Sequence, residues 1–296
     1  MKAAFAVQQS RAALWFVSPA LGLMAVFFVF PVLGGLILSL TDFDIYAIGS
    51  PDTVRFVGLE NYRQLAANPV FWTALKNTFY FVLVGGPLSV LASLVAALQL
   101  NAPGVRLRPL FRTVYFAPVV TTLVAVAIVW RYLYHPRYGL INHVLGWFGA
   151  GPIDWLGDPN WSMPAIILLA VWKNFGYAML IFVAGLGSIA EELYDAAAID
   201  GAGPWRRFLH VTLPGLAPTF VFVGITTMIG YFQLFAEPYV MTQGGPLRST
   251  TSVVLLMYEE GFRWWRMGVA SSIAFVLLVI TLVATVVQMR LQRGRG

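Results

Sequence analysis

Six long apolar runs constrain this chain more than any other feature. They cover approximately residues 14–40, 72–99, 113–134, 164–187, 216–238 and 268–289. A helix rises about 1.5 Å per residue, so about twenty apolar residues cross a hydrocarbon core about 30 Å thick. The runs therefore predict an all-α integral membrane protein with six transmembrane helices, forming a single transmembrane domain over residues 1–296.

The composition excludes an ordinary soluble domain and several kinds of chemistry. Of 296 residues, 59% are hydrophobic and only 11% are charged, which is too much apolar surface for one core. The chain has no cysteine, so disulfides, thiol catalysis and cysteine metal sites are excluded. Its three histidines lie on different segments without metal-ligand spacing, and we expect no metal site.

The distribution of charge predicts the orientation of the chain. The N-terminal tail, the 100–112 connection, the polar segment near 191–214 and the C-terminal tail should lie on one face. Together they carry ten basic and four acidic residues, whereas the opposite face carries eight basic and nine acidic residues. The ten basic residues are Lys2, Arg11, Arg106, Arg108, Arg112, Arg206, Arg207, Arg290, Arg293 and Arg295. The positive-inside rule puts this face, with both termini, in the cytoplasm of a cell with a bacterial-type inner membrane. The net charge of +6 thus indicates membrane orientation and not nucleic-acid binding.

A polar island, Glu191 to Pro218, interrupts the apolar pattern between the fourth and fifth spans. Good helix formers precede Gly201, acidic residues lie near the start of that segment, and Pro204 can open a second helix. We expect the second helix to end at Leu213-Pro214. The resulting helix-turn-helix at a membrane face is a natural docking element for another protein.

The same segment resembles a known family. Asp195-Ala196-Ala197, Gly201, Val211 and Leu213-Pro214 match the signature loop of binding-protein-dependent ABC importer permeases, with Asp195 replacing the usual glutamate and Val211 the usual isoleucine. The resemblance implies the type I importer permease fold, with residues 189–214 (the coupling loop) docking in a cleft of an ATPase subunit. The residues it assigns to ATPase coupling are Glu192, Asp195, Ala196, Ala197, Gly201, Arg206 and Pro214.

Two outer segments extend the resemblance to carbohydrate-type permeases. Phe56 to Tyr62 looks like the motif that follows their first span, and Leu234 to Thr242 with Gly244-Gly245-Pro246 looks like the segment after their fifth. The resemblance implies import of a sugar, a di- or oligosaccharide, by alternating access. The implied partners are a second homologous permease, two ATPase subunits and an extracytoplasmic solute-binding protein. A glycerol-3-phosphate permease of the same fold stays open as an alternative.

The chain cannot bind ATP through a P-loop, which requires Gly-Lys followed by Ser or Thr. Its three lysines, Lys2, Lys76 and Lys173, follow Met1, Leu75 and Trp172. We therefore expect no cofactor on this chain and assign ATP and Mg²⁺ to the partner ATPase subunits.

Polar residues inside the spans indicate a solute pathway. A lysine at mid-depth costs on the order of 3 kcal/mol unless it pairs or reaches water. Lys173 could line the pathway, with Glu237 as a counter-charge, or make a structural contact, and both interpretations stay open. Amides and aromatic faces suit sugar recognition. The tentative pathway residues are Lys173, Asn174, Tyr177, Tyr231, Gln233 and Glu237.

Two other classes of protein fit the sequence less well than an importer. An ion-coupled secondary carrier should show repeated halves or acidic residues at mid-membrane, and neither is evident. A membrane-embedded enzyme should show a nucleophile with its base, paired carboxylates or a metal cluster, and none is visible. We therefore expect a transporter component that is not an enzyme.

Overall fold

The computed structural model describes residues 15–50, 52, 54–102 and 104–293. Within these ranges the regular elements are helices, and extended backbone pairs only at an isolated bridge between Thr41 and Phe56. The all-α class is therefore confirmed. Lys2, Arg11, Arg295 and the first residue of the predicted first span lie outside the described residues.

Five described helices are long and apolar enough to cross a membrane, and a bent pair of helices brings the number to six if it counts as one span. The five are Trp15–Ser39, Pro69–Asn101, Pro159–Gly187, Ala217–Met241 and Met267–Arg290, and the bent pair is Arg108–Val120 with Leu123–Leu133. The chain divides into two compact units. The smaller comprises residues 1–67 and 257–276, and the larger comprises 68–256 and 277–296.

The smaller unit is organised around the C-terminal end of the first helix. That helix includes a π-helical segment, Ala25–Val29, followed by α2 (Phe30–Ser39). The amide of Asn61 in α3 (Glu60–Ala67) donates to the carbonyl oxygens of Ser39 and Thr41, both at 2.8 Å. The Tyr62 and Ser39 hydroxyls lie 2.8 Å apart. The motif at Phe56 to Tyr62 thus supplies partners that the end of a helix otherwise lacks.

Two further contacts tie this unit together. The backbone N–H of Gly268, near the start of α16 (Met267–Arg293), donates to the Phe43 carbonyl at 3.0 Å. The Arg55 side chain bonds the Asp42 carboxylate, and the Arg55 backbone N–H bonds it as well. These bonds from Arg55 hold the pKa of Asp42 below its usual range.

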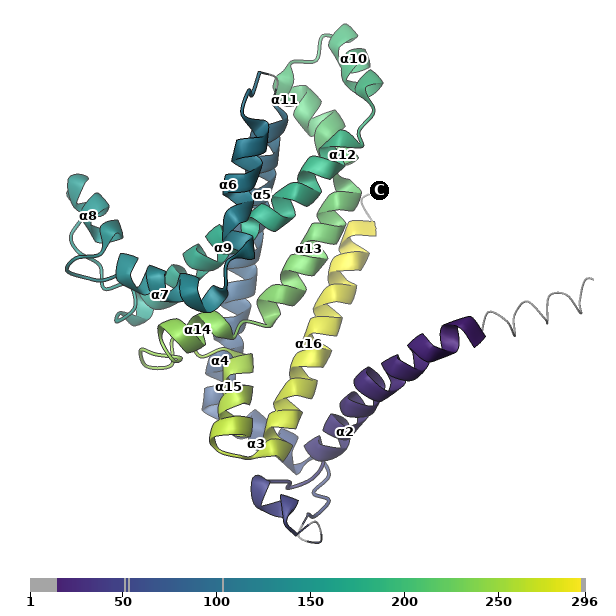
Figure 1. Cartoon of the computed structure of the whole chain (residues 1–296), viewed down its shortest axis with the longest axis vertical. Coiled ribbons are helices and arrows are strands. Elements are labelled where there is room, and N and C mark those ends of the chain that lie inside the picture. Colours follow the sequence, from purple (N-terminus) through teal and green to yellow (C-terminus); the bar gives the residue numbers. More distant parts are fainter. Residues whose placement is uncertain (1–14, 51, 53, 103, 294–296) are drawn as a thin grey trace, which may run out of the picture. The chain divides into compact units, whose positions relative to one another are not determined.

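The larger unit contains a bundle of long helices (Figure 1). α4 (Pro69–Tyr80) runs through a π-helical segment, Phe81–Gly85, into α5 (Gly86–Asn101). α9 (Pro159–Gly187) packs against α5 and α6 (Arg108–Val120), and α13 (Ala217–Phe232) packs against α5. The other elements of the larger unit are α7 (Leu123–Leu133), α8 (Leu140–Trp147), α10 (Glu191–Ile199), α11 (Pro204–Arg207), a π segment (Phe208–Thr212), α12 (Leu213–Gly215) and α14 (Ala236–Met241). α15 (Val253–Tyr258) begins in the larger unit and ends in the smaller one, which also contains a π segment (Glu259–Arg263).

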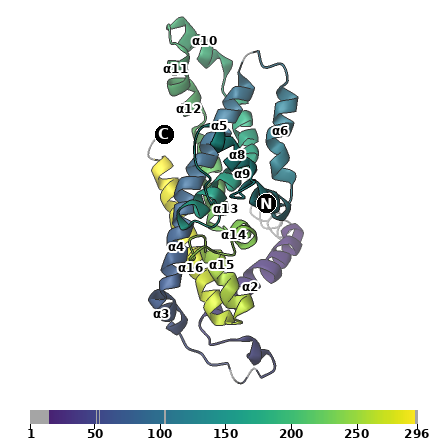
Figure 2. The ribbon, with the colours of Figure 1, turned by 90° about the vertical axis from the view of Figure 1, so that its left-hand side faces the viewer.

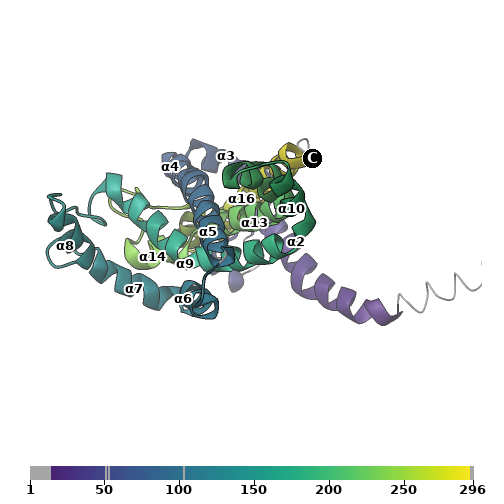
Figure 3. The same cartoon turned by 90° about the horizontal axis from the view of Figure 1, so that it is seen from above.

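The third predicted span is a broken helix. The sequence predicts one apolar run over 113–134, but the chain bends by 99° between α6 and α7, across Thr121 and Thr122. The Thr121 hydroxyl donates to the Pro118 carbonyl at 2.6 Å, closing the end of α6. Figure 1 shows α6 running along α5 and α7 turning away from it, and in Figure 3 α7 and α8 extend to one side of the bundle.

One end of the larger unit carries the elements predicted to be cytoplasmic. Figures 1 and 2 both place α10 and α11 at the same end as the connection between α5 and α6. These are the coupling loop and the basic 100–112 segment. Their proximity agrees with a shared membrane face.

Candidate functional site

The coupling loop is an exposed helical hairpin with a defined turn. Gly201 has φ of +73°, its backbone N–H bonds the Ala198 carbonyl at 3.0 Å, and the Ala202 N–H bonds the Ala197 carbonyl at 2.9 Å. This is the Schellman arrangement, in which glycine tolerates the left-handed conformation without a Cβ penalty. The predicted stop at Gly201 is therefore explained by the local backbone.

The second half of the hairpin is longer than the sequence predicts. Pro214 does not end the helix: α11 continues through the π segment Phe208–Thr212 into α12, and the path changes at Leu216 instead. The Tyr194 hydroxyl of α10 lies 3.0 Å from the Thr212 hydroxyl and joins the two arms.

The surface of the hairpin is suited to docking. No residue of α10 or α11 is buried, and Ile199 and Trp205 are 87% and 68% exposed. Large apolar side chains exposed beside charges are typical of interaction surfaces. Of the residues assigned to coupling, Ala197 is half-buried, and the exposed ones are Glu192, Asp195, Ala196, Gly201, Arg206 and Pro214.

A cavity of about 520 Å³ lies in the larger unit. It is lined by the π-helical segment between α4 and α5, by α5, by both sides of the α6–α7 break, and by α9, α13 and the start of α14. Five of the six predicted pathway residues line it: Asn174, Tyr177, Tyr231, Gln233 and Glu237. The sequence grouped them only by their polarity within apolar runs, and the fold brings them to one space.

Lys173 is not among the cavity-lining residues. Its side chain is 8% exposed, and its ammonium donates to the carbonyl oxygens of Pro118 and Thr121, both at 2.9 Å, and of Val119 at 3.4 Å. Lys173 and Glu237 lie within electrostatic range, but no ion pair joins them in the described part of the chain. The contacts of this lysine are those of a cap on the broken third span.

Close helix packing holds that cap in place. A Cβ at Gly176, one turn after Lys173, would lie 2.1 Å from the Tyr115 carbonyl oxygen, so only glycine permits α9 to approach α6 this closely. On the other side of α9, the Ser93 hydroxyl donates to the Phe175 carbonyl at 2.9 Å. One turn of α9 therefore contacts both α5 and α6, and the same turn places Asn174 and Tyr177 in the cavity lining.

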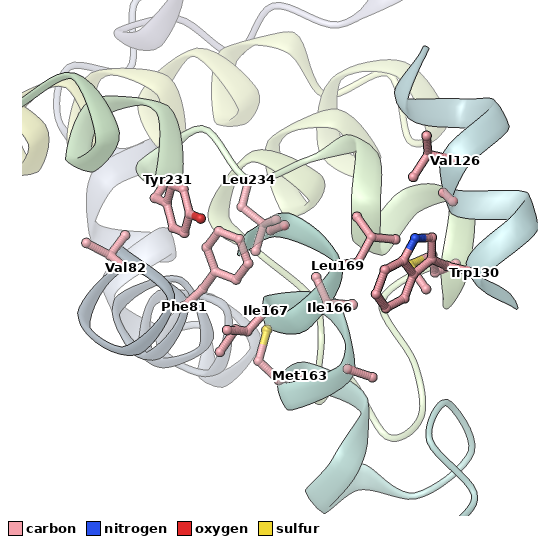
Figure 4. Close-up of a cluster of buried hydrophobic side chains, with 14 of the residues drawn as sticks. Phe81, Val82, Val126, Trp130, Met163, Ile166, Ile167, Leu169, Tyr231 and Leu234 are labelled. Atoms are coloured by element: carbon pink, nitrogen blue, oxygen red, sulfur yellow. The ribbon is translucent and has the colours of Figure 1, made fainter. Parts of the chain in front are cut away.

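Tyr231 sits in a fitted position in the cavity wall. Its ring stacks on Phe81 with 4.8 Å between centroids, and the absence of a side chain at Gly85 leaves room for it, since a Cβ there would lie 2.8 Å from the ring. Figure 4 shows Tyr231 beside Phe81 and Leu234 within the buried cluster. The Tyr231 hydroxyl is buried without a hydrogen-bond partner among the described atoms.

Some lining residues were missed by the sequence analysis. Phe81, Ser89, Thr226, Thr227 and Phe235 also line the cavity. The small hydroxyl residues inside apolar runs were the available signal. They are easily taken for helix-internal bonds, which Thr226 also makes, at 2.9 Å to Phe222.

A second group of missed residues fixes the segment that follows α14. The Asn77 amide of α4 donates to the carbonyl oxygens of Arg248 and Thr251, at 2.8 and 3.0 Å. The Ser162 hydroxyl of α9 lies 2.8 Å from that of Ser249. Gly244-Gly245-Pro246, which has the composition of a turn, precedes these residues, and the contacts anchor the segment to α4 and α9. The run of hydroxyls from Ser249 to Ser252 was the signal for this anchoring.

Apolar spans, a solute-sized cavity among them and an exposed hairpin at one end together define a multi-pass membrane transport component. A family model described as "Binding-protein-dependent transport system inner membrane component" matches residues 89–295. The chain belongs to this family, as the resemblance predicted. It is a membrane permease component and not an enzyme, and the secondary-carrier alternative is not favoured.

Comparisons with individual proteins agree with this assignment. The chain is 37% identical over 285 residues to the lactose transport system permease protein LacF of Rhizobium radiobacter, covering 95% of this chain and 93% of the relative. It is 32% identical over 277 residues to the sn-glycerol-3-phosphate transport system permease protein UgpA of Pectobacterium atrosepticum, covering 93% and 91%. The crystal structure of a bacterial alginate ABC transporter in complex with alginate pentasaccharide-bound periplasmic protein contains a chain that matches with a TM-score of 0.80 at 21% identity, covering 97% and 96%. That likeness shows the fold, which is the type I importer permease fold predicted from the sequence.

Proposed function

We propose that this chain is the permease subunit of an ATP-driven importer that passes a sugar into the cytoplasm by alternating access. The observation that carries the proposal is one compact unit containing both a cavity lined by amides, hydroxyls and aromatic rings and an exposed helical hairpin. The cavity volume of about 520 Å³ lies within the range of about 300–1,000 Å³ that is typical of small-molecule sites. A di- or oligosaccharide is the solute that this lining suits.

The partners in this proposal follow from what the chain lacks and exposes. ATP and Mg²⁺ are held by two ATPase subunits that dock on the coupling loop, and this chain itself holds no cofactor. A second homologous permease completes the pathway, and an extracytoplasmic binding protein delivers the solute. Both termini and the coupling loop lie in the cytoplasm, in agreement with the basic residues near α10, α11 and the α5–α6 connection.

Glycerol-3-phosphate stays the alternative solute, because the relative UgpA is named for that solute. The two solutes differ in charge. A phosphate group favours a cationic site with arginine or lysine donors. The charges around the cavity therefore decide between them.

Affinity purification from membranes tests the assembly. The tagged chain, extracted in mild detergent, should retain a P-loop ATPase and a second six-span protein identified by mass spectrometry. Gly201→Asp adds a side chain and a negative charge at a left-handed position of the turn and should lower ATPase recovery at least about fivefold while the second permease stays bound.

Gly203→Asp is the matched control for that variant. It adds the same charge two residues away, where φ is −69° and aspartate is favourable at the helix N-cap. Its ATPase recovery should exceed that of Gly201→Asp. Purification of the wild-type chain alone in several mild detergents would contradict the proposal.

A further inference from the structure

The charges around the cavity are distributed unevenly. Glu237 is the one charged residue among the described residues that line it, and no lysine, arginine or histidine joins it. The other polar groups are neutral: Asn174 and Gln233 are amides, and Tyr177, Tyr231, Ser89, Thr226 and Thr227 are hydroxyls. An anionic solute would therefore meet a carboxylate without meeting a cationic side chain.

The nearest basic residue in the same unit is already engaged. The Lys173 ammonium donates to carbonyls of Pro118, Val119 and Thr121, at and just beyond the C-terminal end of α6. The C-terminal end of a helix carries a partial negative charge, which offsets the charge of a lysine bound there. Releasing the ammonium to an anion would take this donor from the Val119 and Thr121 carbonyls, whereas the Pro118 carbonyl would keep its bonds from Thr121.

The neutral groups suit a hydroxyl-rich solute. Tyr231 offers a buried hydroxyl without a partner among the described atoms, and such a group is a donor and an acceptor for a ligand. The carboxylate of Glu237 can accept charge-assisted bonds from sugar hydroxyls. Phe81 and Phe235 add aromatic faces to the same wall.

We infer that the cavity takes uncharged saccharides and excludes anionic solutes such as sugar phosphates and sugar acids, with Glu237 as the specificity-determining residue. The inference rests on the proposed function and deepens it, because it decides against glycerol-3-phosphate. It also separates this chain from a permease for an acidic polysaccharide, although the two share a fold.

The absence of cysteine makes a direct measurement of cavity charge possible. Thr226→Cys places a single thiol in the lining at a position exposed to the cavity. The assembled transporter in membranes is treated with a cationic (trimethylammonium-ethyl) or an anionic (sulfonatoethyl) methanethiosulfonate, and the ratio of the two rates is compared with that for 2-mercaptoethanol. We expect the cavity thiol to favour the cationic reagent by about tenfold relative to the free thiol, since a cleft of one sign focuses counter-ions.

Two variants of the reporter chain isolate the role of Glu237. Glu237→Gln should bring the ratio to within about twofold of the free thiol, because it removes the charge and keeps the shape. Asp154→Asn removes an equal charge outside the cavity lining and should leave the ratio unchanged. The inference is overturned if the cavity thiol favours the anionic reagent, shows no preference or fails to react. It is also overturned if Glu237→Gln leaves the rate ratio unchanged.

Protection of the same thiol tests the class of solute. Millimolar lactose should slow modification of Thr226→Cys, whereas lactobionate, the corresponding acid, should protect at least about threefold less. Glu237→Gln should reduce this difference in protection between the two solutes. Equal or better protection by lactobionate overturns the inference. Both measurements report the reactivity of one thiol, whereas the purification reports which subunits stay bound, so failure here is distinguishable from failure of the importer assembly.

Discussion

The ammonium nitrogen of Lys173 lies 2.9 Å from the carbonyl oxygen of Pro118, the internal proline of α6. The two residues are 55 positions apart in the sequence. Proline distorts the end of α6, and the lysine supplies a donor to the carbonyls that the break frees. A charged residue inside a span is thereby accounted for by structure.

Lys173→Met should therefore destabilise the protein more than it alters solute affinity. The variant takes a donor from the Val119 and Thr121 carbonyls, while the Pro118 carbonyl keeps its bonds from Thr121. A carbonyl left without a donor away from water costs about 1–3 kcal/mol, so we expect a lower unfolding temperature of the detergent-solubilised transporter. Lys173→Arg keeps the charge and several donors and should restore part of the loss. An unchanged unfolding temperature with a raised KM for uptake would instead assign Lys173 to the solute pathway.

Gly176→Ala should be strongly destabilising. The new Cβ would lie 2.1 Å from the Tyr115 carbonyl oxygen, so α6 and α9 would have to separate. Overpacking of this kind costs about 1–3 kcal/mol. Thermal unfolding in detergent measures the effect.

Gly187→Ala is the matched control on the same helix. Nothing lies within 4 Å of a Cβ at Gly187, and alanine is the better helix former, so this variant should be neutral or slightly stabilising. Equal unfolding temperatures for the two alanine variants would refute the close approach.

Asn61→Ala should loosen the end of the first helix. It removes the donor shared by the Ser39 and Thr41 carbonyls, for an expected loss of about 1–3 kcal/mol. Gln64→Ala, an exposed change on the same helix α3, should cost less than about 0.5 kcal/mol. Limited proteolysis within residues 40–60 would report the difference, and similar cleavage of both variants would argue against the cap.

Tyr231→Phe should separate stability from transport. Its hydroxyl has no partner among the described atoms, so its removal should change the free energy of unfolding by less than about 0.5 kcal/mol. Loss of a bond to the solute should raise the KM for sugar uptake by about two- to tenfold, in keeping with a charge-neutral hydrogen bond of about 0.5–1.5 kcal/mol. An unchanged KM would remove Tyr231 from the pathway.

Gly85→Ala tests how the Tyr231 ring is held in place. The added Cβ would lie 2.8 Å from the Tyr231 ring and should displace it from Phe81. We expect this variant to lose both stability and uptake, unlike Tyr231→Phe. Measuring unfolding and uptake of both variants therefore distinguishes the packing of the Tyr231 ring from the function of its hydroxyl.

Local patterns in the sequence predicted much of this protein. The apolar runs predicted the spans, and the polar island with Gly201 predicted the helical hairpin and its turn. Both are recoverable because helix length, apolarity and the demand for a left-handed glycine act over a few neighbouring residues. The signature at Asp195 to Pro214 also predicted the family to which the chain belongs.

Only the tertiary structure decided what Lys173 contacts, that the third span breaks by 99°, and that five polar residues share one cavity. The lysine looked the same from the sequence whether it faced solute, Glu237 or backbone. Its partners are carbonyls, which carry no residue signature, and they are reached only because Gly176 lets two helices touch. Sequence periodicity gives the face of one helix, whereas the partner of that face depends on packing between segments far apart in the chain.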